Sequence, residues 1–175
     1  KMKKIFVSII IAIPLFYSSQ VAIGKDTTTN TSVSLEFGNE PKGIILPWAT
    51  SENSVTGAVN GTFILDVAEK KVKVKLASGW KDLSVYNSNN AIDNSLQTNP
   101  QYPEKANAKA TIGNPSSTPG ILVLEDNNKA MILPLVENAH INIKSPAPGM
   151  MAYDPLTQQL AVYNGTKWTF WKPRN

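Results

Sequence analysis

The sequence contains no cysteine, one histidine (His140), no glycine-rich phosphate loop and, after residue 20, no apolar stripe of helical spacing bounded by caps. The absence of cysteine excludes disulfides, thiolate metal sites and lipid attachment through an N-terminal cysteine. A triad built on histidine needs a serine and a carboxylate placed by the fold, and no strand–turn–helix elbow is present. We therefore expect a non-enzymatic, mostly β protein that uses no cofactor and no metal.

A short apolar run lies at the front of the chain. After the first lysines, residues 5–17 are almost wholly apolar, which is shorter than the roughly 20 residues that cross a bilayer. A basic start, a short apolar core and small residues predict a secretory signal peptide in residues 1–20, cleaved between Ser19 and Gly24. The alternative is an uncleaved anchor. We expect export to the cell surface, the medium or the periplasm, with no transmembrane segment after cleavage.

The positive charge of the chain is partly that of this leader. Of 17 basic residues three lie in the leader, so the remainder nearly balances the 13 acidic residues, and we expect no nucleic-acid partner. Lys71, Lys73 and Lys75 alternate with apolar residues, which predicts a strand with a solvated basic face. A patch for nucleic acid or acidic glycan is less favoured, because the matching strand in residues 158–163 carries no charge.

The clearest structural signal lies near the end of the chain, in residues 149–171. Two apolar runs are separated by Asp154-Pro155, which is typical of a turn. Asn164-Gly165 then tolerates the positive φ angles of a tight hairpin turn. Alternating polar and aromatic residues follow. The pattern predicts three short antiparallel strands in a meander.

The same pattern occurs earlier in the chain. Gly61 lies five residues before Asp66 and Trp80 follows 14 residues after it, and the same spacings join Gly149, Asp154 and Trp168. Further matches run upstream at offsets of 87 and 89 residues: Ile44-Ile45-Leu46-Pro47 with Met131-Ile132-Leu133-Pro134, Leu35-Glu36 with Leu124-Glu125, and Ile23-Gly24 with Ile112-Gly113. An ordered series of matches at a nearly constant offset indicates a duplicated unit.

The predicted fold is therefore all-β, with two tandem related β-meander units. We call residues 21–84 the first half and residues 110–175 the second half; residues 85–109, rich in asparagine and proline, are the predicted linker. Each half has about 64 residues, a size at which a single core is marginal. We expect the halves to pack on each other or on further copies in an oligomer.

Asp66 and Asp154 are the acids that the duplication relates. Each ends a predicted strand and begins a turn, where an aspartate caps backbone N–H groups. Paired carboxylates also catalyse glycoside hydrolysis, which is the least favoured alternative. Equivalent acids in equivalent turns would serve the fold twice, so we expect the structural role.

The aromatic residues are the better candidates for a contact surface. Trp80 and Trp168 keep register in both halves and are predicted to be core. Trp171 has no aromatic counterpart, because Leu83 occupies its place. Together with Tyr153 and Tyr163, it forms the predicted contact surface for another protein or, alternatively, a stacking platform for a glycan.

Several motifs resemble a known group of proteins. The segments Gln20–Gly24 and Lys42–Pro47 resemble the opening QVGIGT…KGxLxPR of exported repeat proteins of Bacteroidota, and Pro148–Asp154 with Tyr163–Trp168 resembles their GxMxYNT…YYNGTxW element. Trp48 and Leu135 stand where arginine is usual. The resemblance implies large surface proteins and tail-fibre-like proteins, and hence oligomers.

The sequence thus predicts an exported, non-enzymatic protein of the envelope or cell surface, with a structural or adhesive role. Its expected partners are other envelope proteins or copies of itself, joined through strand edges and aromatic faces. A carbohydrate-binding module is the alternative function, with a glycan as partner.

Overall fold

The structure is a computed structural model that describes residues 20–85, 89, 91–95, 101, 105, 108–114 and 116–172. The predicted all-β class is confirmed, because nearly all regular structure consists of short strands. The described helical segments are η1 (Glu52–Ser54) and α1 (Ala139–Asn142). None of the described helices has the length and apolar character needed to cross a membrane. The predicted signal peptide, apart from residue 20, and most of the predicted linker lie outside the described residues.

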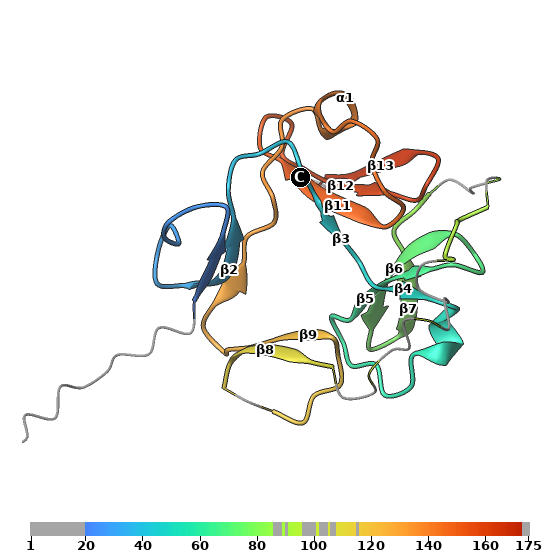
Figure 1. The fold of residues 1–175 in the computed structure, drawn as a ribbon, viewed down its shortest axis with the longest axis horizontal. Helices are drawn as coiled ribbons and strands as arrows, with labels where there is room; N and C mark the ends of the chain where they lie inside the picture. Colours follow the sequence, from blue (N-terminus) through green and yellow to red (C-terminus); the bar gives the residue numbers. More distant parts are fainter. Residues whose placement is uncertain are drawn as a thin grey trace, which may run out of the picture.

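The strands form four sheets, which Figure 1 shows at separate positions around a circle. The sheets combine strands in the orders β1-β2-β10, β4-β5-β6-β7, β8-β9 and β13-β12-β11-β3. The strand bounds are β1 Val21–Ile23, β2 Val33–Phe37, β3 Ile44–Ile45, β4 Trp48–Ala49, β5 Phe63–Asp66, β6 Lys71–Leu76, β7 Gly79–Asp82, β8 Ala110–Gly113, β9 Leu122–Glu125, β10 Ala130–Met131, β11 Met150–Asp154, β12 Gln159–Tyr163 and β13 Trp168–Trp171.

Both predicted meanders are present, and they share one register. Leu65 lies opposite Val72 between β5 and β6, and Tyr153 lies opposite Leu160 between β11 and β12. Three pairs of the β6–β7 ladder, from Lys73↔Asp82 to Lys75↔Trp80, recur in the β12–β13 ladder at the offset of 88. The turns match as well, because Lys70 and Gln158 hold positive φ angles of 58° and 56°. These matching registers and turns support the proposal that the two halves arose by duplication.

The upstream strands also repeat, with one difference from the predicted alignment. β1 runs parallel to β2 and β8 runs parallel to β9. Ile23 lies opposite Phe37, whereas its counterpart Ile112 lies opposite Leu124. Leu124 therefore takes the place of Phe37, not that of Leu35, because backbone pairing fixes the register and short apolar runs do not.

The halves share strands with each other. β10 of the second half lies parallel to β2 of the first, and β3 of the first half lies antiparallel to β11 of the second. The main core also draws on both halves. Its buried members are Leu46, Leu65, Val72, Leu83, Met151 and Val162. The halves therefore pack on each other, which is one of the two arrangements that their small size predicts.

Candidate functional site

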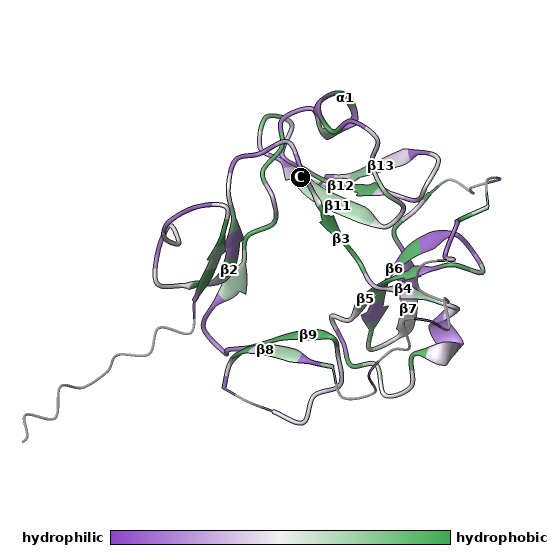
Figure 2. Ribbon diagram, viewed as in Figure 1, coloured by the Kyte–Doolittle hydropathy of each residue, from purple (hydrophilic) through white to green (hydrophobic). Residues whose placement is uncertain are grey.

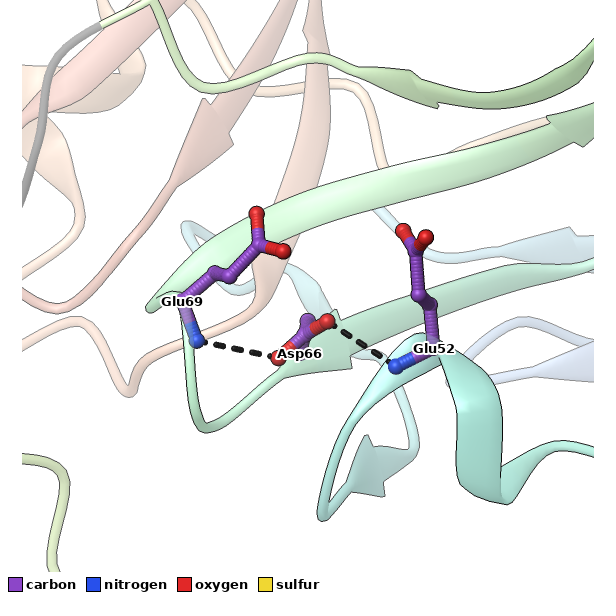
Figure 3. A group of neighbouring side chains, drawn as sticks. All are labelled: Glu52, Asp66 and Glu69. Atoms are coloured by element: carbon purple, nitrogen blue, oxygen red, sulfur yellow. Dashed lines mark hydrogen bonds between the residues drawn. The ribbon is translucent and has the colours of Figure 1, made fainter.

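Asp66 organises the turn that follows β5. Its Oδ1 accepts a hydrogen bond from the backbone N–H of Glu69 at 3.0 Å, and its Oδ2 accepts one from the N–H of Glu52 at 2.9 Å (Figure 3). The side chain is almost fully buried, at 1% exposure. One carboxylate therefore ties the turn after β5 to the start of η1.

Asp154 does the same in the second half. Its Oδ1 accepts hydrogen bonds from the N–H groups of Leu156 at 2.9 Å and Thr157 at 3.2 Å, and its Oδ2 accepts one from Asn138 at 3.1 Å. Glu69 and Thr157 both lie three residues after their aspartates. The predicted structural role of Asp66 and Asp154 is confirmed, since both acids hold backbone N–H groups in equivalent turns.

The first half adds a cluster of acids around Asp66. Carboxylate oxygens of Glu52, Asp66 and Glu69 lie within 4.8 Å of one another, which is a spacing that could hold a cation. Figure 3 shows the side chains of Glu52 and Glu69 extending to the same side of the buried aspartate. This cluster was not predicted, because Glu52 lies in η1, 14 residues before Asp66.

The cation in this cluster is the ammonium of Lys73. Its Nζ lies 2.7 Å from Glu52, 3.0 Å from Asp66 and 2.9 Å from Glu69. The prediction of a solvated basic face was wrong here, because Lys73 is only 4% exposed. Equivalent positions in the two meanders contained a signal that strand alternation missed: the position of Lys73 corresponds to that of Ala161, a small and fully buried residue. The cluster is therefore an internal ion-pair network in which Lys73 takes the position of a metal.

The pKa values of the cluster follow from this pairing. Burial favours a neutral Asp66 and would raise its pKa, but the N–H of Glu69, the ammonium of Lys73 and the N–H of Glu52 outweigh burial, so the pKa is lowered. Burial would lower the pKa of Lys73, yet its hydrogen bonds to Glu52, Glu69 and Asp66 raise it above the usual range. At neutral pH the carboxylate of Asp66 and the ammonium of Lys73 are therefore both charged, which keeps them paired as an anion and a cation.

The predicted contact residues lie on two faces of one sheet. Tyr153 and Trp171 both pair with Leu160, so they project from the same face of β11-β12-β13. Tyr163 projects from the opposite face, with its ring 5.3 Å from that of Trp168. All three predicted contact residues are half-buried, and the structure does not bring them together on one surface.

Trp171 links the halves. Its Nε1 donates a hydrogen bond to the backbone oxygen of Leu83 at 2.8 Å, and its ring packs against the main core. The Nζ of Lys81 lies 5.7 Å from the centre of the ring. Trp168 packs against a second cluster of buried residues, while Trp80 is half-buried with Lys75 over its ring.

His140 lies exposed in α1, with its ring edge-on to Phe170 at 5.5 Å. A depression near α1 includes one ionisable side chain, Glu137, among its lining residues Asn39, Pro41, Leu135, Val136, Glu137, Asn142 and Pro155. Neither arrangement provides the paired groups that acid–base or nucleophilic catalysis requires.

Comparison with known proteins adds one finding about the second half. Residues 107–173 match the model of a protein family described as phage tail like trimerisation region. The match covers less than half of the chain, and it contains the whole β11-β12-β13 meander. It supports the tail-fibre-like part of the predicted resemblance, whereas the assignment to Bacteroidota stays a prediction. Neither the curated proteins nor the solved structures gave a significant match.

Proposed function

We propose that this protein is a non-enzymatic structural protein that associates with copies of itself, in trimers, through its β sheets. The match of residues 107–173 to a trimerisation region carries the proposal. The shared register of the two meanders supports extending that role to the first half. The acids that the sequence related to glycosidases hold backbone N–H groups instead, so hydrolysis is not part of the proposal.

The oligomeric state of the purified protein tests this proposal. Light scattering coupled to size-exclusion chromatography should give three times the mass of the chain across a range of concentrations. The mass of a single chain at every concentration would overturn the proposal. A stable dimer would retain self-association and reject the trimer.

The place of action is proposed from the leader sequence. We propose that the protein is exported and acts in the envelope or at the cell surface, in a structural or adhesive assembly. The basic, apolar and small-residue pattern of residues 1–20 supports this location. Mass spectrometry of protein from the cell envelope should show a chain that begins between residues 20 and 25. An intact chain confined to the cytoplasmic fraction would reject export.

A further inference from the structure

The chain contains an internal strand contact between its halves. β10 lies along β2 in parallel, with Met131 opposite Leu35. The N–H of Ile132 donates to the backbone oxygen of Leu35 at 2.9 Å. This added strand covers β2, and Leu35 is only 2% exposed.

The second half contains a counterpart of β2, and among the described residues no strand equivalent to β10 covers its edge. β9 is the counterpart of β2, and Leu122, opposite Ala110, holds the place that Leu35 holds opposite Val21. Among the described residues β9 pairs only with β8. Leu122 is 50% exposed and the neighbouring Ile121 is 56% exposed. Such an apolar, unpaired edge is what a further strand would cover.

The backbone groups of this edge are correctly oriented. The N–H of Ala110 donates to the oxygen of Ile121 at 2.8 Å, so Ile121 directs its backbone groups toward β8. Backbone groups alternate between the two sides of a strand, so Leu122 directs its oxygen toward the open edge. This is the arrangement by which Leu35 accepts its hydrogen bond from Ile132.

The chain also contains the matching donor. β3 corresponds to β10, since Ile44-Ile45-Leu46-Pro47 matches Met131-Ile132-Leu133-Pro134. The N–H of Leu46 donates to the backbone oxygen of Gly149 at 3.1 Å, so Leu46 directs its N–H toward the strand β11. Because backbone groups alternate along a strand, the N–H of Ile45 points away from β11. Ile45 is 55% exposed, whereas its counterpart Ile132 is half-buried. Figure 2 shows both β3 and β9 as hydrophobic strands.

We propose that β3 of one copy adds to the open edge of β9 in a second copy, in parallel and with Ile44 opposite Leu122. The N–H of Ile45 then donates to the backbone oxygen of Leu122. The intermolecular contact repeats the internal β10–β2 contact, so the occupant of the edge is a second copy of this chain. This inference rests on the proposed self-association and names the surface that carries it.

The same placement brings a second pair of strands together. Within the chain, β3 also lies on β11, with Ile44 opposite Met151. Applied between copies, this contact places β10 of the copy that provides β9 along β5 of the copy that provides β3, with Met131 opposite Phe63. The contact joins two different surfaces, so it forms a ring where its rotation closes. Three chains would then give a ring of six related halves.

Paired cysteines test the register directly, because the natural chain has none. Neighbouring strands lie about 4.8 Å apart, and a disulfide needs a Cα separation of about 4.4 to 6.8 Å. After mild oxidation, the variant Ile44→Cys/Leu122→Cys should run as covalent dimers and trimers on a non-reducing gel. The pair Leu35→Cys/Met131→Cys is the matched control, because it should form the same bond within one chain. The variant Ile45→Cys/Leu122→Cys should not link chains, because its side chains project from opposite faces.

A second variant tests the contact without a covalent bond. Leu122→Lys places a charge on an already exposed position, so the circular dichroism spectrum should stay unchanged. The dissociation constant of the assembly should rise at least tenfold, as measured by light scattering across a dilution series. An unchanged dissociation constant would count against β9 as the interface.

The outcomes separate this inference from the proposed function. A trimer whose Ile44→Cys/Leu122→Cys variant forms no link between chains would overturn the β3–β9 contact and leave self-association standing. A natural chain that stays monomeric at all concentrations would overturn both. Links between chains in the 44/122 pair but not in the 45/122 pair support the contact in the stated register.

Discussion

The meanders of the two halves share one register, but different side chains occupy equivalent buried positions in them. At one position of the shared ladder the first half has Lys73 among three carboxylates, and the second half has the buried Ala161. Around both positions the aspartate turns stay the same. The turns and the strand register are therefore the same in both meanders. The buried position between them holds an ion-pair network in one half and a small apolar side chain in the other.

The largest difference should appear when Lys73 is removed. Lys73→Ala leaves the buried carboxylate of Asp66 without its ammonium partner, and we expect the free energy of unfolding to fall by about 3 to 5 kcal/mol. Lys75→Ala on the same strand is the matched control, and it should cost about 0.5 to 1 kcal/mol through its contact with Trp80. Urea denaturation at one protein concentration measures both. Equal costs would mean that the network does not stabilise the first half.

The aspartate turns should respond next. Asp154→Ala leaves the N–H groups of Leu156, Thr157 and Asn138 without their acceptor. We expect the free energy of unfolding to fall by about 1 to 3 kcal/mol. Asp66→Ala should cost more, because it also removes a partner of Lys73. The exposed Asp93→Ala should change stability by no more than about 0.5 kcal/mol. If Asp154→Ala were as mild as Asp93→Ala, the turn would not depend on its acid.

Trp171 distinguishes the halves at the end of the meander, where Leu83 is its counterpart. Trp171→Phe keeps most of the packing and removes the hydrogen bond to the oxygen of Leu83, so we expect a loss of about 1 kcal/mol. Thermal unfolding followed by circular dichroism provides the measurement. Unchanged stability combined with weaker self-association would instead place Trp171 in the predicted contact surface.

The smallest effect concerns the acid limb of the stability curve. Lys25 and Thr29 donate hydrogen bonds to Glu36 and lower its pKa to about 2 from 4.5. The unfolded chain therefore binds more protons than the folded chain between these values, so stability should decline as the pH falls from 4.5 to about 2.

Glu36→Gln should flatten this decline, as measured by urea midpoints from pH 7 down to pH 2. Glu125→Gln is the comparison in the second half, because hydrogen bonds from Ser116 and Thr118 also lower the pKa of Glu125. A decline of the same slope in natural protein and Glu36→Gln would show that this carboxylate does not contribute to acid sensitivity.

The meanders were predictable because their turns have a local chemical cause. Gly61, Asp66 and Trp80 have counterparts at the same spacing, and each turn is closed in part by a hydrogen bond that its aspartate accepts from an N–H three residues later. The burial of Lys73 was not recognised, because strand alternation alone assigned it to the solvated side. The small apolar residue Ala161 at the equivalent position indicates a buried site more reliably than strand alternation does.

The exchange of β3 and β10 between the halves was beyond sequence reasoning. A strand of two residues, such as Ala130–Met131, fits many partners equally well, and its neighbour is selected by the packing of the whole chain. The parallel pairs β1–β2 and β8–β9 were also not predicted, because parallel pairing leaves no tight-turn signal between the strands.

The exchanged strands also limit how the protein can be divided. An excised second half would lose β3 from the edge of β11, and the remaining first half would lose β10 from β2. Each fragment would then carry a newly bare sheet margin prone to indiscriminate pairing. The smallest fragment that keeps all strand pairs therefore contains both halves. Residues 107–173 alone, joined to another protein, would lack the strand that the first half adds to β11.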